Sequence, residues 1–176
     1  MMKQIYSDYR RVFALSAVAQ LVCTALMTAG LLIAGVFEHE TLRYVGIAAV
    51  ALIAISALWS TASTFVIAPI MLKKQIQTLP QNDREQLFKE YGSAKQVGAH
   101  RYTENCFIFY SNRLIYIYRY ADVTALTKKG ARNLLVHSEN KKAVTMPFQS
   151  GGANAIAAAY IKSHNPNIKF SVENSN

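Results

Sequence analysis

Two long uncharged stretches dominate the first 72 positions of the chain. The first covers residues 12–37 and the second residues 44–72, and neither contains Asp, Glu, Lys, Arg or His. A helix rises about 1.5 Å per residue and the hydrocarbon core of a bilayer is about 30 Å thick, so about 20 apolar residues suffice to cross it. Because backbone polar groups in lipid must be satisfied within the segment, each stretch predicts a transmembrane helix.

A short link, residues 38–43, separates the two stretches, so the helices should form an antiparallel hairpin with both chain ends on one side. Lys and Arg near membrane spans mark the cytoplasmic side. The link holds Arg43 alone, whereas five basic residues flank the spans toward the chain ends: Lys3, Arg10, Arg11, Lys73 and Lys74. We therefore expect an integral, multi-pass membrane protein with both termini cytoplasmic.

A cleaved signal peptide is the alternative for the first stretch, because basic residues precede it. The apolar region of a signal peptide usually runs about 7–15 residues and ends in a small-x-small cleavage site. The first stretch is longer than that and lacks a clear site of this kind. A retained helix is therefore favoured.

Polar residues recur every four positions in both stretches, so each helix should carry one polar stripe. The stripes comprise Ser16, Gln20, Thr24 and Thr28 in the first span and Ser56, Ser60 and Thr64 in the second. Counted from the predicted inner ends the stripes are level, which predicts three facing pairs: Gln20 with Thr64, Thr24 with Ser60, and Thr28 with Ser56. Close interhelical packing is the expected role. The alternative is a polar pore in a homo-oligomeric channel or transporter assembly, although no charged residue within the spans marks an ion path.

The remainder of the chain is basic and has the composition of a soluble domain. From residue 73 onward it contains 15 Lys and Arg against seven Asp and Glu, so it carries nearly all of the net charge of +9. We divide the chain into an N-terminal segment with the hairpin, residues 1–78, and a cytoplasmic domain, residues 79–176.

The domain is predicted to combine antiparallel strands with two helices. Asn82 as a cap, Glu85 and Gly92 predict a short amphipathic helix over 82–91. Aromatic and β-branched residues predict strands at 106–110 and 114–120, joined by a Ser111-Asn112 turn, and further strands at 123–127, 134–138 and 143–148. A last helix should run from Gly151 to about His164, with an inward face made of Ala153, Ile156, Ala157, Tyr160 and Ile161. The fold class is therefore α+β, a small antiparallel sheet closed by a C-terminal helix.

Several short motifs accompany this order of elements: Tyr102-Thr103-Glu104-Asn105 leading into Phe107-Ile108-Phe109, then Asp122-Val123, and Asn165-Pro166-Asn167-Ile168 after the last helix. With them, residues 99–176 resemble bacterial pleckstrin-homology-like (PH-like) domains attached to membrane helices. More narrowly, the chain resembles an uncharacterised family of bacterial proteins with two N-terminal transmembrane helices. It departs from that pattern at Ala125-Leu126, where an aromatic is expected, and after Ile168, where a Gly-Tyr pair is lacking. The resemblance implies a PH-like fold anchored in the bacterial inner membrane, and it brings no reaction with it.

Few residues point to catalysis or to a cofactor. The four histidines are scattered without the spacing of a metal site, and the carboxylates do not suggest an acid/base pair. Cys106 opens an apolar strand and Cys23 lies in a span, which favours inert thiols. Gly151-Gly152 before a helix favours a cap over an anion site. We expect no enzyme, and no catalytic, metal-binding or cofactor-binding residue.

Positive charge is the remaining functional signal. We expect contact with anionic lipid headgroups from seven residues: Lys73, Lys74, Lys128, Lys129, Arg132, Lys141 and Lys142. A solvated basic surface is the alternative, the first hairpin turn is too short for a phosphoinositide-binding loop, and nucleic acid is not expected as a partner. The sequence thus predicts a non-enzymatic, membrane-anchored interaction module that contacts membrane lipids or a protein partner. A subunit of an oligomeric channel or transporter is the second hypothesis.

Overall fold

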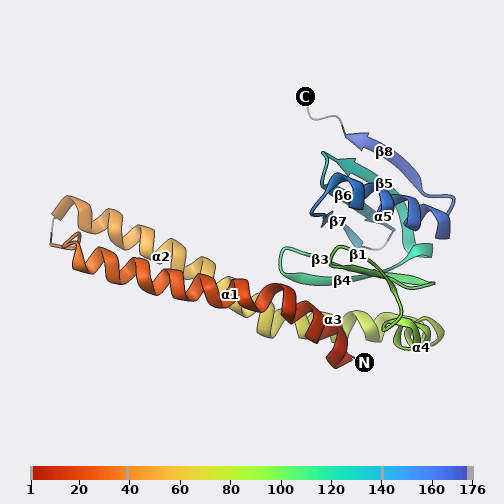
Figure 1. Cartoon of the computed structure of the whole chain (residues 1–176), viewed down its shortest axis with the longest axis horizontal. Coiled ribbons are helices and arrows are strands. Elements are labelled where there is room, and N and C mark those ends of the chain that lie inside the picture. Colours follow the sequence, from red (N-terminus) through yellow and green to blue (C-terminus); the bar gives the residue numbers. More distant parts are fainter. Residues whose placement is uncertain (1, 39, 140, 174–176) are drawn as a thin grey trace.

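The computed structural model describes residues 2–38, 40–139 and 141–173. Helix α1, Met2–Ile33, is followed by one unbroken helix made of three parts: α2 (Glu40–Ala62), a π-helical turn η1 (Ser63–Ile67) and α3 (Ala68–Thr78). The two helices form a long hairpin that projects from the rest of the molecule (Figure 1). Both are long and apolar enough to span a membrane.

The hairpin turns earlier than the uncharged stretches suggest. Gly35 adopts a left-handed φ of 64°, and the N–H of Val36 donates to the carbonyl of Leu31 at 3.2 Å. This is the hydrogen bond of a glycine-terminated helix, so α1 ends before the predicted link at 38–43. Helix α1 also begins at Met2, well before the predicted start at residue 12.

Because the turn lies earlier, the predicted pairing of the two polar stripes is wrong. Thr64 is level with Tyr6, whose hydroxyl donates to the Thr64 carbonyl at 3.1 Å, and not with Gln20. Hydroxyls in the spans donate one turn back along their own helices: Thr24 to Gln20, Thr28 to Thr24 and Thr64 to Ser60.

The seven stripe residues also differ in burial. Ser60 and Thr64 are buried, and Gln20, Thr24 and Thr28 are half-buried, whereas Ser16 and Ser56 are exposed. A spacing of four residues advances about 40° beyond a full turn, so a stripe with this spacing drifts off a straight contact face. This drift explains why both stripes have members on exposed faces.

The remaining chain folds into two four-stranded sheets with two further helices. Helix α4 (Gln81–Glu90) precedes the first sheet, which is antiparallel in the order β1 (Lys95–Val97), β2 (His100–Tyr102), β3 (Cys106–Ser111) and β4 (Leu114–Arg119). A short 3₁₀ turn, η2 (Tyr120–Asp122), leads to the second sheet. That sheet contains β5 (Val123–Lys129), β6 (Asn133–Ser138), β7 (Lys141–Pro147) and β8 (Lys169–Glu173), in the order β7-β6-β5-β8.

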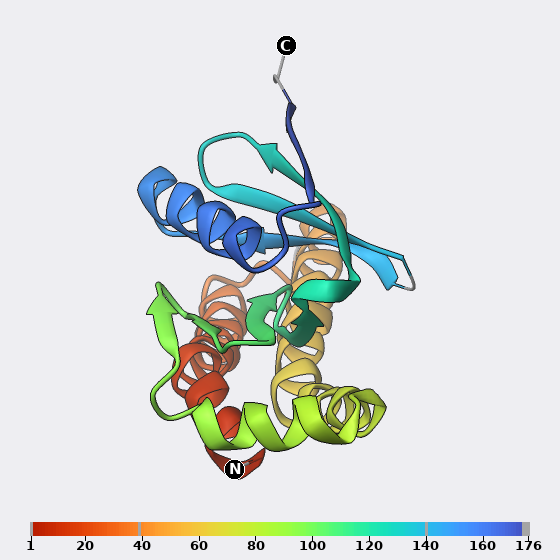
Figure 2. The same cartoon turned by 90° about the vertical axis from the view of Figure 1, so that its right-hand side faces the viewer.

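Helix α5 (Gly151–His164) lies between β7 and β8 in the sequence, and β8 runs parallel to β5. Ser150 caps α5 by accepting a hydrogen bond from the Ala153 N–H at 3.3 Å. Figure 2, which looks along the hairpin, shows the sheets and α5 on one side of it and α4 at its base. The α+β class with antiparallel sheets is confirmed, while β1, β2 and β8 were not predicted.

Two details of the predicted helices are wrong. Helix α4 begins at Gln81 with Pro80 as its N-cap, so Asn82 lies inside the first turn and does not cap it. In α5, Ile156 is 52% exposed, and Asn154 takes the buried position instead because its side-chain amide donates to the Asn133 carbonyl at 2.9 Å.

The two sheets and α5 enclose a first apolar cluster, which we call the domain core. Both sheets contribute aromatic and aliphatic side chains, and α5 covers it with small residues. Its members are Val97, Tyr102, Phe107, Phe109, Tyr118, Tyr120, Val123, Leu126, Leu134, Val136, Met146, Phe148, Ala157, Ala158, Ile161 and Ile168.

A second cluster, which we call the junction core, lies between the first sheet and the base of the hairpin. It takes side chains from α1, α3, α4, β3 and β4, on both sides of the domain boundary predicted at residues 78/79. Its members are Ile5, Tyr9, Ala68, Leu72, Ile76, Leu79, Leu87, Tyr91, Cys106, Ile108, Tyr110, Ile115 and Ile117. Every residue of β3 is therefore buried, since one face belongs to each core.

Truncating Ile117 should destabilise the protein strongly. Its side chain is fully buried in the junction core, and a buried Ile→Ala change costs about 2–5 kcal/mol. Ile117→Ala should therefore lower the free energy of unfolding in detergent by that amount, measured by denaturant titration. Ile156→Ala, at an exposed position of α5, is the matched control. Equal losses in both variants would contradict the existence of a second core.

Candidate functional site

The free edge of the first sheet is closed by a single side chain from the hairpin. Strand β4 is the last strand of its sheet, so the outward N–H and C=O groups of Ile115 and Ile117 have no neighbouring strand. The side-chain amide of Gln75 in α3 donates to the Ile115 carbonyl at 2.7 Å and accepts from the Ile117 N–H at 2.7 Å. One glutamine thus forms the pair of hydrogen bonds that a peptide unit of another strand would form, and it ties α3 directly to the sheet.

Lys141 completes this closure from the second sheet. Its ammonium donates to the Ile117 carbonyl at 2.9 Å and lies 4.6 Å from the centre of the Tyr118 ring. Burial of the ammonium lowers the pKa of Lys141 from its ordinary value. Lys141 is therefore engaged within the protein and holds the edges of the two sheets together.

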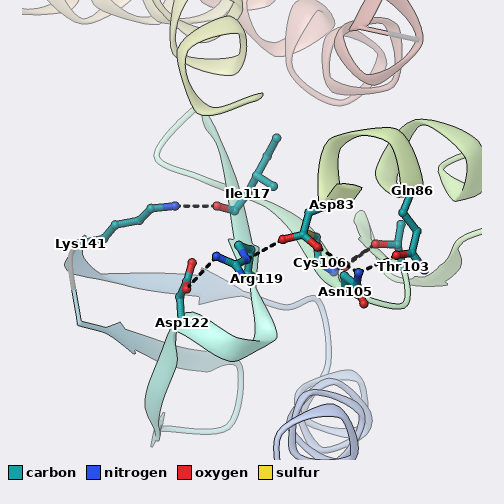
Figure 3. A network of polar contacts seen from close by, with 9 residues as sticks. All are labelled: Asp83, Gln86, Thr103, Asn105, Cys106, Ile117, Arg119, Asp122 and Lys141. Carbon is teal, nitrogen blue, oxygen red and sulfur yellow. Dashed lines mark hydrogen bonds and ion pairs between the residues drawn. The ribbon is translucent and has the colours of Figure 1, made fainter. Parts of the chain in front are cut away.

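A polar network fastens α4 to the opposite end of β4 (Figure 3). Arg119 pairs with Asp83 of α4 at 2.8 Å and with Asp122 of η2 at 3.5 Å. Asn105 donates to Asp83 at 3.0 Å and to Gln86 at 2.6 Å. Both carboxylates are thus paired with one guanidinium, an arrangement that suits anchoring of α4.

Cys106 lies beside this network and is fully buried. Burial raises the pKa of its thiol to about 12, and the nearby Asp83 carboxylate acts in the same direction. The thiol therefore stays protonated at neutral pH, and thiolate chemistry is suppressed.

The turn between β3 and β4 reaches toward the hairpin. It consists of Asn112 and Arg113, both with positive φ (48° and 61°). The Arg113 guanidinium donates to Ser16 at 3.1 Å and to the side-chain oxygen of Gln20 at 3.2 Å, and the hydroxyl of Tyr9 donates to the Arg113 carbonyl. Two residues of the predicted polar stripe thus bind an arginine of the domain.

The other predicted basic residues are spread over three surfaces. Lys73 and Lys74 are exposed on α3, between the junction-core residues Leu72 and Ile76. Lys128, Lys129 and Arg132 surround the β5–β6 turn, where Lys129 pairs with Glu173 at 3.4 Å. Lys142 is exposed in β7 and lines, with Lys141, a groove of about 540 Å³ beside Met71 and Gln75.

His100 joins the two sheets at the end near α1. It is buried, and its Nε2 lies 2.6 Å from the Pro147 carbonyl, so this nitrogen carries the proton. The Nδ1 atom is buried without a partner among the described residues. Burial therefore lowers the pKa of His100, because a second proton would place an unpaired charge in the interior.

The sequence reasoning missed the contacts made by Gln75, Arg113 and His100. Each side chain binds a backbone or side-chain group at least 40 residues away in the sequence, so local pattern carries no signal for it. The Asn112-Arg113 pair is the exception, since a two-residue turn with positive φ normally favours Asn-Gly and the arginine is conspicuous there. Among the described residues, no group of His, Cys, Asp and Glu side chains is arranged to hold a metal ion.

Comparison of the chain with models of protein families, with curated proteins and with solved structures finds no match.

Replacing Gln75 by Leu should open the edge of β4. The variant removes both hydrogen bonds and leaves the Ile115 carbonyl and the Ile117 N–H without partners, which costs about 1–3 kcal/mol. Thermal unfolding should show this loss, and amide hydrogen exchange should show faster exchange at Ile117. Gln77→Leu, an exposed position on the same helix, is the control. Unchanged exchange at Ile117 would contradict the closure of the edge by Gln75.

The stability of the protein should fall in mild acid because of His100. Its pKa is lowered in the folded state, so below about pH 6.5 the unfolded chain takes up a proton that the folded chain resists. This contribution is complete above pH 6.5 and is lost as the pH falls, by at most about 1.4 kcal/mol per pH unit. His100→Gln should flatten the pH dependence between pH 7 and 5, measured by denaturant titration. Exposed His164→Gln should keep the loss seen in the wild type, and a parallel slope in His100→Gln would refute the assignment.

Proposed function

We propose that the protein is an integral membrane protein whose helical hairpin crosses the bilayer. Only 6% and 17% of the most apolar windows of the two long helices are buried in the structure, whereas a core helix of a soluble protein is mostly covered. Large apolar side chains project freely along both helices, including Leu15 at 79% and Ile33 at 88% exposure. A continuous exposed apolar surface of this extent requires lipid or another protein.

Retention of α1 is supported by its contribution to the junction core. Ile5 and Tyr9 lie within the first two and a half turns of α1 and are fully buried there. Removal of the helix as a signal peptide would uncover the faces of β3 and β4 that pack in the junction core. The hairpin is therefore proposed as a permanent anchor.

The orientation follows from the basic residues and from the site of the domain. Basic side chains cluster at the domain end of the hairpin, and the outer turn has Arg43 beside Glu38 and Glu40. The positive-inside tendency therefore supports a cytoplasmic domain and cytoplasmic chain ends.

The junction core carries the functional proposal, because it fixes how the domain faces the membrane. A flexible tether would let the domain rotate, but α1, α3 and α4 hold one face of the first sheet. Figure 1 shows the β3–β4 turn on the side of the domain nearer the hairpin. We assign to the β5–β6 turn, with Lys128, Lys129 and Arg132, the contact with anionic headgroups.

Lys73 and Lys74 have a lesser part in this proposal. Twenty residues, the length that spans hydrocarbon, reach Ala14 when counted from Ile33 in α1 and Trp59, next to Ser60, when counted from Glu40 in α2. The helical rise then places Lys73 about 20 Å beyond Ser60, which exceeds the range of unscreened attraction to the headgroups. Lys141 is engaged with Ile117, and Lys142 faces the groove beside α3.

The function supported best is that of a non-enzymatic interaction module held in one orientation at the cytoplasmic membrane surface. A four-stranded antiparallel sheet, a second four-stranded sheet whose strands β7, β6 and β5 are antiparallel, and a closing helix support the PH-like assignment of its domain. The groove beside β4 and the basic turn are the surfaces offered to a protein partner and to lipid. The hydroxyls of Thr24, Thr28 and Thr64 donate within their own helices, so a pore formed by several hairpins gains no support from these three residues.

Cysteine accessibility in intact cells tests this placement. Glu40→Cys, at the outer end of α2, should react with a membrane-impermeant maleimide from outside. Lys162→Cys, exposed on α5, should react only after permeabilisation. Cys23→Ala removes the span thiol, and buried Cys106 is an internal negative control. Labelling of both positions from the same side, or release of the protein by alkaline carbonate, would refute the proposed function.

A further inference from the structure

Arg113 is a charged residue whose surroundings do not neutralise it. Its guanidinium donates to two neutral side chains, Ser16 and Gln20. The ion pairs found within residues 2–38, 40–139 and 141–173 do not include Arg113. One of its terminal nitrogens, Nη1, is buried without a hydrogen-bond partner in the same part of the chain. A partly buried cation with these contacts is incompletely satisfied, because a guanidinium has five N–H donors and a charge that favours an anion.

Arg113 adopts a backbone conformation that would suit glycine better than arginine, which indicates that the arginine side chain has a role of its own. Arg113 has a φ of 61°, a conformation that disfavours residues with a Cβ, and Asn-Gly is the preferred pair in such a turn. A glycine after Asn112 would form the same turn with less strain. Residues in strained backbone conformations cluster at functional sites, so the guanidinium of Arg113 is a candidate binding group.

Two hydroxyls of the hairpin are also unsatisfied. Ser60 Oγ and Ser63 Oγ, at the inner end of α2 and in η1, are also buried without partners. Together with Arg113 Nη1 they make up three of the five such side-chain atoms found in the described residues. The other two, His100 Nδ1 and Ser138 Oγ, belong to the domain, so most of the unpaired side-chain atoms in the described residues belong to the hairpin or to the arginine that contacts it.

The level of the guanidinium identifies the class of anion. Twenty residues counted inward from the end of α1 at Ile33 reach Ala14, so Ser16 lies about 3 Å from the expected edge of the hydrocarbon. Phospholipid phosphates lie just outside that boundary, and arginine binds phosphate oxygens through parallel N–H donors. Ser16 is exposed, accepts from Arg113 and retains its own hydroxyl proton, so it has a donor for a second phosphate oxygen.

We propose that Arg113 and Ser16 bind the phosphate group of an inner-leaflet phospholipid at the seam between the β3–β4 turn and α1. The proposal rests on the proposed function, since it requires the hairpin to cross the bilayer. It differs from a diffuse attraction of basic turns to the membrane surface, because one lipid occupies one site. It also gives Ser16 and Gln20, in the middle of α1, a role in ligand orientation.

The test uses the full-length protein, delipidated in detergent and titrated with phosphatidylglycerol under native mass spectrometry. The wild type should retain one lipid, and Arg113→Gln should weaken its binding at least about tenfold, as expected for loss of a charge-assisted hydrogen bond. Lys162→Gln, which removes one positive charge at an exposed position of α5, should bind the first lipid like the wild type. Arg113→Gly should lose the lipid equally while suiting the left-handed turn, so its thermal unfolding separates lost binding from lost folding.

Three outcomes would overturn the proposal. Wild-type affinity in both Arg113 variants would show that the guanidinium does not hold the lipid, and an equal loss in Lys162→Gln would reduce the effect to net charge. Displacement of the lipid by millimolar inorganic phosphate would identify a free-anion site instead. Carbonate extraction of each variant distinguishes these results from failure of the proposed function, because membrane-inserted variants with unchanged lipid binding refute only the site.

Discussion

The first sheet owes its place in the molecule to being covered on both faces. Antiparallel sheets commonly leave one face in water, and their strands then alternate between apolar and polar residues. Strand β3 does not alternate, since Phe107 and Phe109 enter the domain core while Cys106 and Ile108 enter the junction core. Hairpin and domain are consequently one structure, and the energy that holds the sheet also holds the orientation of everything attached to it.

Much of the fold could be predicted from apolar pattern, and its limits have a common cause. The uncharged stretch at 44–72 indicates a membrane helix, yet Ala68 and Leu72 at its inner end are covered by the sheet. A run of apolar residues looks the same in the sequence whether its side chains contact lipid or protein. The short strands β1 and β2, three residues each, fall below the length at which alternation is readable.

The candidate site was less accessible to prediction, because its contacts depend on distances along the chain that no local motif encodes. Gln75 was an ordinary polar residue at the end of an apolar helix, and only the folded structure places its amide against β4. Lys141 was expected at the membrane surface by charge alone, but its ammonium is committed to Ile117. Charge predicts which residues are available for an interaction, and geometry decides which of them remain available.

The unbroken course of α2, η1 and α3 has a mechanical consequence. Residues 40–78 form a rod about 58 Å long, and Gln75 at its inner end is bonded to β4. If the hairpin crosses a bilayer as proposed, the rod tilts to match a thinner or thicker hydrocarbon layer, and a tilt of about 10° about its midpoint moves each end by about 5 Å. The first sheet is bonded to the end of the helix and must move with it. Bilayer thickness would therefore set the angle between the domain and the membrane surface.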